Sequence, residues 1–503
     1  MRDDQFDVIV IGAGLSGLVC AGYLVKSGLR VALLEQHSLP GGCCSSFERN
    51  GFVFDSGAHS LGSCRSGAEI DRVIHDLQLN GRDNFALRRA MPSDVVITRD
   101  FMLQVWGDTD QTIDEFSGVF PRERQALEKF FKEVSYCDVR SSEHFANFVR
   151  KYQMCTFRDL LDEYFQDERL KQVLSAFLGN VGLPSTRVSA LRAIVMLKEF
   201  ILDGGYYVTG GMHRFVDRLA RNFEHWGGIL KYRTKATRIE TDGLGVTGIV
   251  TDREKRIGAK IVVSSGSPRQ TFVSMLQTES KPWSSRLEEF CTRIERLEPS
   301  VSAMVLYLGV KRETSDQLPG RTVWYLPTYK ADEVYNEVFM GNPDIEARTL
   351  LAAFPSRYDN SLAPEHYETI NLFALAPFVS EAFWKSHKEL IAEALIARAN
   401  EFIPLLRERI VFKEVATPVT IRRYTLNDQG AMYGLSSVPL QMSSRLMPQK
   451  TIVPGLYLAS HWATVGTGQG GTPMAAFAGR NAARLILKSL RVATTVVASS
   501  GHG

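Results

Sequence analysis

Residues 6–35 read FDVIVIGAGLSGLVCAGYLVKSGLRVALLE. Within them Val8–Ile11 is an apolar, β-branched run of the kind that forms a buried parallel strand. A glycine turn follows at once, residues 15–27 have the pattern of a helix, and residues 30–34 are a second apolar run that leads into Glu35. This order of strand, glycine turn, helix, strand and acidic residue predicts a Rossmann-like, α/β dinucleotide-binding unit.

Each residue of the motif has a physical role in holding a dinucleotide. Gly12 permits the tight turn, Gly14 lets the backbone approach a pyrophosphate, and Gly17 lets helix and strand pack closely. Ser16 lies in the first turn of the helix, whose free N–H groups and partial positive charge attract phosphate. Glu35 can accept hydrogen bonds from a ribose 2′-OH, and its charge disfavours the 2′-phosphate of NADP.

A second glycine pair indicates which dinucleotide is bound. Gly41 and Gly42 follow six residues after the acidic residue, and Ser45 lies just beyond them. Such a pair lets the chain pass close to an extended ligand. FAD is longer than NAD and needs this path for its ribityl chain, so the spacing favours FAD as the cofactor.

The block from Glu35 through Phe47–Gly57 (FERNGFVFDSG) resembles the amino-terminal block of the phytoene desaturase, carotenoid isomerase and retinol saturase superfamily of flavoproteins. That superfamily is in turn similar to the amine oxidases. Many amine oxidase-like members have arginine after the glycine pair, where this chain has Cys43. No guanidinium contact to the pyrophosphate is therefore expected at that position.

Two later blocks extend the resemblance. Residues 206–228 read YYVTGGMHRFVDRLARNFEHWGG, and strand-like stretches follow at 229–240, 246–252 and 256–263. They are similar to the second FAD-binding segment of the superfamily, a helix followed by a β-meander, which implies that Ala236 lies near the adenine. Residues 455–460 (GLYLAS) are typical of a strand, and a glycine-rich turn then leads to a helix over 472–487. The resemblance implies that Gly470, Gly471 and Thr472 face the flavin.

The matching blocks imply an activity. Residues 417–434 resemble the isomerase and saturase branch in particular, so we expect an FAD-dependent oxidoreductase that moves a hydride between flavin N5 and a conjugated polyene or isoprenoid. Desaturation, saturation and cis–trans isomerisation all remain open, as does the electron donor or acceptor. His59 and His461 are the candidates for proton transfer, because each follows a block expected beside the flavin ring.

The distribution of the blocks predicts two interleaved domains. Residues 1–80, 205–270 and 450–490 would form a discontinuous FAD-binding domain with a β-meander. Residues 81–204 and 271–449 would form a substrate-binding domain with a mixed sheet and helices, and residues 491–503 a flexible tail.

Two other functions remain open. An amine oxidase-like enzyme would need an aromatic pair facing the flavin. A non-catalytic prenyl- or lipid-binding protein could use the same fold without the cofactor, but the intact glycine motif and Glu35 argue against this.

Composition limits the remaining classes of function. The formal net charge of +3 gives no reason to expect nucleic-acid binding. Seven cysteines without a CxxC pair argue against a disulfide scaffold and against a metal site. Residues 188–201 mix apolar side chains with charged ones, which fits a packed helix better than a membrane anchor. We expect a cytoplasmic protein with an apolar small-molecule substrate, free in solution or attached at a membrane surface.

Overall fold

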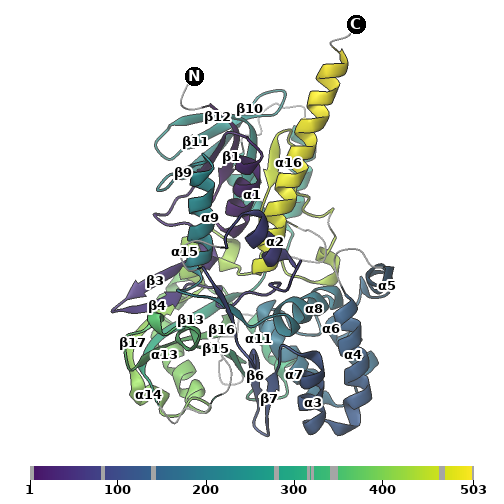
Figure 1. Cartoon of the computed structure of the whole chain (residues 1–503), viewed down its shortest axis with the longest axis vertical. Coiled ribbons are helices and arrows are strands. Elements are labelled where there is room, and N and C mark those ends of the chain that lie inside the picture. Colours follow the sequence, from purple (N-terminus) through teal and green to yellow (C-terminus); the bar gives the residue numbers. More distant parts are fainter. Residues whose placement is uncertain are drawn as a thin grey trace.

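The computed structural model describes residues 5–80, 85–137, 143–276, 283–313, 318, 322–339, 349–443, 445–463 and 471–500. Two large sheets organise them. Figure 1 shows the first sheet together with the N-terminal strand and the long C-terminal helix in the upper half, and the second sheet with most of the helices below. Segments from both ends of the chain therefore build the same half of the molecule.

The first sheet is the predicted dinucleotide-binding sheet. Its strands lie in the order β10-β11-β12-β1-β2-β9, and β18 pairs with β12. The pairs β1–β2, β1–β12, β2–β9 and β12–β18 are parallel, whereas β10, β11 and β12 form an antiparallel meander. The strands are β1 Gln5–Ile11, β2 Val31–Leu34, β9 Ile229–Lys231, β10 Ala236–Thr241, β11 Val246–Thr251, β12 Arg256–Ser264 and β18 Leu456–Leu458.

Helices cover both faces of this sheet. On one face α1 (Leu15–Lys26) packs between α9 (His213–His225) and α16 (Thr472–Ser500), and Figure 1 shows the three side by side. On the other face α10 (Ser284–Glu295) joins the apolar cluster that contains the β1 residue Ile9. The structure therefore assigns α10 to the FAD-binding half, although residues 271–449 were expected in the substrate domain.

The second sheet has the strand order β17-β13-β16-β15-β14-β6-β7. Its pairs are antiparallel except β14–β6. Side chains alternate across β13: Met304 and Leu306 pack in the cluster that includes α13 (Glu381–Ala399), whereas Ala303 and Val305 face the other way. The strands are β6 Asp94–Ile97, β7 Met102–Val105, β13 Ser302–Lys311, β14 Thr322–Tyr325, β15 Leu350–Ala353, β16 Tyr367–Ala376 and β17 Ile410–Ala416.

A helical layer lies beside the second sheet and shares one apolar cluster with it. Its helices are α3 Thr109–Val119, α4 Arg124–Tyr136, α5 Glu143–Tyr152, α6 Phe157–Tyr164, α7 Glu168–Ala176 and α8 Ala190–Met196. Every residue of α8 is buried, so this segment is a packed helix, the reading preferred over a membrane anchor. Among the described residues no helix is both long enough and apolar enough to cross a bilayer.

Shorter elements connect the two halves. Two ribbons, β3–β4 and β5–β8, are separate from both large sheets, and Figure 1 shows β3–β4 between them. These and the remaining helices are β3 Ser46–Arg49, β4 Phe52–Asp55, β5 Leu87–Arg89, β8 Tyr206–Val208, α2 Glu69–Asp76, α11 Ala331–Phe339, α12 Pro355–Tyr358, α14 Leu406–Arg409 and α15 Pro418–Thr425. All seven cysteines are free thiols.

Two predicted elements differ from the structure. Residues 229–240 were expected as one strand, but the chain forms β9 and β10 with a turn between them, where Arg233 has a φ of 50°. The helix expected to end at residue 487 continues to Ser500, so residues 491–500 are helical rather than an irregular tail. Figure 1 shows this end of α16 projecting beyond the rest of the protein. Residues 501–503 lie outside the described part.

A buried carboxyl in β6 makes stability depend on pH. Burial raises the pKa of Asp94 to about 6, although its Oδ1 accepts a hydrogen bond from Trp324 Nε1 at 2.9 Å. Because the folded pKa lies above the unfolded one, this residue's contribution to stability is lost as pH rises through about 6. Asp94→Asn keeps the acceptor and removes the charge. We therefore expect the variant to gain about 1 kcal/mol of unfolding free energy relative to wild type between pH 5 and pH 8.

Urea titrations at both pH values measure this difference. The exposed Asp252→Asn is the matched control, because it makes the same chemical change outside the core. The prediction would be contradicted if the unfolding free energy of wild type exceeded that of Asp94→Asn by an amount that grows with pH.

Candidate active site

One cavity of about 590 Å³ lies between the two sheets, and residues of both sheets line it. Predicted cofactor residues gather along one side of it: Gly12, Gly14, Ser16, Glu35, Gly41, Gly42, Ser45, Ala236, Gly471 and Thr472. Gly17 lies just behind this wall, and Gly470 lies outside the described residues. His59 and His461 also line the cavity. Residues from three distant parts of the chain (12–59, 236 and 461–472) thus meet in one place.

The glycine motif leaves room for a ligand at one position only. A Cβ on Gly17 would lie 2.0 Å from the carbonyl oxygen of Gly12, and a Cβ on Gly12 would lie 2.4 Å from Ser265 Oγ. Around Gly14, by contrast, an added Cβ would meet nothing within 4 Å. Gly14 is the N-cap of α1 and no side chain caps the helix, so the N–H groups of its first turn face this open space.

Glu35 connects the turn to the end of β2. Its Oε2 accepts a hydrogen bond from Ala13 N at 2.8 Å, and its Oε1 accepts one from His37 N at 2.9 Å. The side chain is buried and lines the cavity. Each carboxylate oxygen retains a lone pair for a further donor, which is what a ribose hydroxyl would supply.

The second glycine pair packs directly on the first motif. Gly41 N donates to Ala13 O at 2.8 Å, and the φ angles of Gly41 and Gly42 are 119° and 56°. Side chains are disfavoured at such angles, so the pair lets the two turns approach closely. Ser45 Oγ donates to Gly42 O at 2.8 Å and holds the turn in place.

Two unpaired polar atoms mark the opposite end of the same wall. Among the described residues, Nε2 of His461 and Oγ1 of Thr472 are buried without a hydrogen-bond partner. Thr472 begins α16, so the N-terminus of this long helix adds a partial positive charge there. Unpaired buried groups beside an open cradle are expected where a ligand completes the hydrogen bonds. These residues fit FAD: the first turn of α1 would hold its pyrophosphate, and His461, Thr472 and the N-terminus of α16 would hold polar atoms of its ring.

The two histidines are both neutral at physiological pH. Burial lowers the pKa of His59 to about 4, and burial likewise lowers the pKa of His461 to about 4. The ring of His59 lies 5.1 Å from the ring of Phe373, centroid to centroid. A neutral imidazole can still hold or pass a proton, but it cannot act as a resident cation in this cavity.

The lowered pKa values of the two histidines predict the direction in which stability changes with pH. The unfolded chain binds a proton at each histidine near pH 6.5, whereas the folded chain does so only near pH 4. Folded-state stability is therefore lost as pH falls from about 6.5 toward 4. We expect His59→Gln or His461→Gln in the apoprotein to reduce the loss between pH 7 and pH 5 by on the order of 1 kcal/mol, as measured by urea unfolding. Equal pH dependence in these variants, in wild type and in the exposed control His225→Gln would contradict burial as the cause.

Arg192 lies beside the predicted cofactor residues, although the sequence did not indicate it as a site residue. It is buried in α8, and its Nη2 lies 3.7 Å from the position that a Cβ on Gly471 would occupy. Burial lowers the pKa of its guanidinium to about 10, and the nearby Tyr433 phenol opposes this shift. The residue therefore stays cationic at neutral pH and adds positive potential behind the N-terminus of α16. A single arginine in an apolar run signals only a packed helix, so no sequence pattern pointed to this position.

The other side of the cavity is mostly apolar. Side chains from the second sheet form it, among them Val305, Trp324, Leu351 and Phe373. Tyr433 closes part of this side, and its hydroxyl donates to Gly179 O at 3.0 Å. Of these five side chains, only Tyr433 lies in the block 417–434 that resembled the superfamily. Trp324 and Phe373 belong to no recognisable motif. They reach the cavity only because their strands pair within the second sheet.

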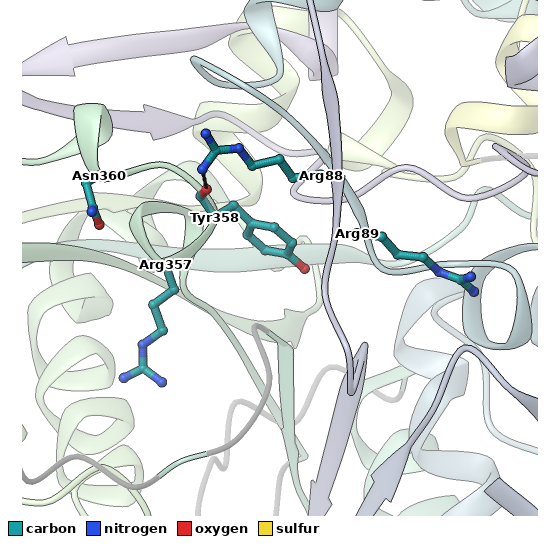
Figure 2. A pocket seen from close by; sticks show the side chains of 5 residues that line it. All are labelled: Arg88, Arg89, Arg357, Tyr358 and Asn360. Atoms are coloured by element: carbon teal, nitrogen blue, oxygen red, sulfur yellow. Dashed lines mark hydrogen bonds between the residues drawn. The ribbon is translucent and has the colours of Figure 1, made fainter. Parts of the chain in front are cut away.

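A second cavity, of about 340 Å³, lies away from these residues. Arg88, Arg89, Arg357, Tyr358 and Asn360 line it, and Figure 2 shows the three guanidinium groups pointing away from one another. Arg88 donates to Tyr358 O at 2.8 Å, Arg89 to Leu202 O at 3.1 Å, and Arg357 to Glu368 at 3.2 Å. These arginines hold chain segments together rather than converging on a ligand.

Known proteins resemble this chain in sequence. The sequence profile of the flavin containing amine oxidoreductases matches residues 15–487. Prolycopene isomerase of Daucus carota is 25% identical over 488 residues, which cover 91% of this chain and 76% of that protein. All-trans-retinol 13,14-reductase of Danio rerio is 23% identical over 506 residues, covering 90% and 82%.

Solved structures agree on the fold. Putrescine oxidase bound to putrescine superposes with a TM-score of 0.67 at 17% identity, covering 96% of this chain and 99% of that one. An oxidoreductase from Methanosarcina mazei gives a TM-score of 0.67 at 18% identity, covering 95% and 99%. The predicted Rossmann-like fold, FAD cofactor and carotenoid desaturase, isomerase and saturase superfamily are confirmed. The chain belongs to the flavin-containing amine oxidoreductase family.

Proposed function

We propose that this FAD-dependent oxidoreductase acts on a long apolar substrate, a conjugated polyene or an isoprenoid, by desaturation, saturation or cis–trans isomerisation. The observation that carries the proposal is the cavity itself, which joins the FAD cradle to an apolar wall. Bound FAD would supply a site at its N5 atom that accepts or delivers a hydride.

The apolar wall supports a lipid-like ligand. Ala303 and Val305 of β13, Leu351 of β15 and Phe373 of β16 face the cavity from three adjacent strands. Such a wall binds by burying apolar area and excludes water from the reacting bond. The charged residues Arg49 and Glu414 also line the cavity, but they pair with each other at 3.4 Å and are half exposed, so they do not oppose an apolar ligand.

The chain's own groups would position the substrate and handle protons. His59 lines the cavity beside Phe373, so it can exchange a proton with a ligand lying on that wall. The N-terminus of α16 and Arg192 place positive potential at one end, where negative charge on reduced FAD would be stabilised. The relatives support a polyene, because their names describe an isomerase of prolycopene and a reductase of retinol.

Anaerobic spectroscopy tests this proposal. Purified holoprotein should show flavin absorption, and all-trans polyenes should either bleach the oxidised flavin or reoxidise the flavin after its reduction with dithionite. A shift in the polyene spectrum without a net change of flavin would indicate isomerisation.

The same experiment separates the alternatives. Putrescine and other amines should leave the flavin oxidised. Bleaching by an amine, with no response to any polyene, would replace the proposal with an amine oxidase. Purified protein that neither contains nor binds FAD would favour a non-catalytic lipid-binding role.

A further inference from the structure

Three polar side chains interrupt the apolar wall of the cavity. Tyr335 lies in α11, Asn180 ends the turn Phe177–Asn180, and Thr349 immediately precedes β15. All three line the cavity. Within the described ranges none of their side chains makes a hydrogen bond to protein, although Tyr335 is 5% exposed. We call these three residues the polar corner.

Tyr433 connects the members of the polar corner. Its hydroxyl donates to the carbonyl of Gly179, the residue before Asn180. Burial raises the pKa of Tyr335 well above its ordinary value, and the nearby Tyr433 phenol and the Asp332 carboxylate raise it further. Tyr433 is therefore near Tyr335 and bonds to the turn that ends at Asn180.

Strand pairing brings Thr349 to the same end of the cavity. The next residue, Leu350, pairs with Tyr325, and Leu351 pairs with Trp324. The ring of Trp324 in turn packs on Gly179, where an added Cβ would lie 2.5 Å from it. Thr349 thus approaches the turn that carries Asn180.

The polar corner carries no charge. The acidic and basic residues among the described cavity-lining side chains are Glu35, Arg49, Lys235 and Glu414, which belong to the nucleotide side and to the Arg49–Glu414 pair. Among the described residues no cationic side chain lines the corner itself, and Arg192, which stays charged near Tyr433, does not line the cavity. A neutral hydroxyl or carbonyl oxygen can bond to each of these groups, because a phenol donates, a primary amide donates and accepts, and a threonine hydroxyl does both.

We propose that the polar corner is an end-group subsite, which binds a neutral oxygen on an otherwise apolar substrate. This inference rests on the proposed function and narrows it to polyene alcohols or aldehydes rather than pure hydrocarbons. A hydrocarbon would displace water from three polar groups and leave them unpaired, which weakens binding by roughly tenfold or more relative to an oxygen-bearing ligand of equal length.

Equilibrium binding to the oxidised holoprotein tests the subsite. The probes are all-trans-retinol and the hydrocarbon in which hydrogen replaces its hydroxyl, each titrated anaerobically while tryptophan and flavin fluorescence are followed. Wild type should bind the alcohol at least roughly tenfold more tightly. Tyr335→Phe and Asn180→Leu should each weaken alcohol binding about tenfold and leave hydrocarbon binding equal or tighter.

Tyr325→Phe is the matched control. Tyr325 also loses one hydroxyl, but that hydroxyl bonds to Glu401, and the residue packs in the cluster on the other face of the sheet. Both affinities should stay unchanged in this variant. Equal binding of alcohol and hydrocarbon by wild type would overturn the subsite while leaving a polyene function intact. If neither polyene binds although flavin is present, the proposed function itself fails, and the subsite with it.

Discussion

Gly14→Ala is expected to weaken FAD binding by roughly 100-fold or more and to leave the apoprotein folded. An alanine Cβ at this position would meet no protein atom within 4 Å, and the φ of −68° suits any residue. The methyl group would instead occupy the open space in front of the first turn of α1. It would keep the pyrophosphate from the N–H groups there, and each charge-assisted hydrogen bond lost is worth about 1.5–3 kcal/mol. Flavin fluorescence during titration of the apoprotein with FAD measures the affinity.

Two further glycines provide the comparison. Gly118→Ala adds the same methyl group to open space on the exposed side of α3, so FAD affinity should not change, and the helix should gain up to about 1 kcal/mol. Gly17→Ala drives its Cβ into the Gly12 carbonyl, so this variant should lose stability as well as FAD. Wild-type FAD affinity in Gly14→Ala would show that the cradle at α1 is not the pyrophosphate site.

Ala303→Phe should reduce polyene turnover by roughly 100-fold and leave the flavin spectrum unchanged. Ala303 lies in β13 as part of the apolar wall, and it packs in the cluster that also contains Phe52 and Phe54 of β4. A phenyl group would fill space that an extended ligand needs and would move the reacting bond away from its position. Single-turnover flavin reduction or reoxidation measures the change.

The neighbouring residue of the same strand provides the control. Met304 points to the opposite face and packs against the cluster that includes α13. Met304→Leu nearly conserves volume, so turnover should remain close to wild type. Equal activity of Ala303→Phe and wild type would mean that the substrate does not pass along β13, and loss of flavin in this variant would place the cofactor there instead.

The first sheet shows which elements can be predicted from residues that are adjacent in the sequence. The apolar run at Val8–Ile11, the glycine turn and Glu35 determine β1, α1 and β2, because each element follows from residues adjacent in sequence. The break within residues 229–240 was missed, since the turn there forms through long-range contacts: Arg233 N donates to His37 O and Thr234 N to Glu35 O. The residues of this β-rich stretch do not indicate that its turn will bond to a distant segment of the chain.

The active-site residues likewise include some that the sequence could predict and others that it could not. The glycines, Glu35 and the two histidines could be named from the sequence because their predicted roles depend on short spacings or on blocks shared with flavoproteins. Arg192, Trp324 and the polar corner were not found, because they come from stretches in which no motif marks a function.

The sequence by itself determined the dinucleotide-binding unit, the flavin family and the residues that can approach a pyrophosphate, because backbone conformation at glycines and the alternation of strand and helix are local properties. Only the tertiary structure decided which side chains face the substrate. The second sheet pairs strands far apart in the chain, so the cavity wall forms only when β13, β15 and β16 meet. The open space at Gly14, the burial of the histidines and the neutral polar corner all arise from that packing.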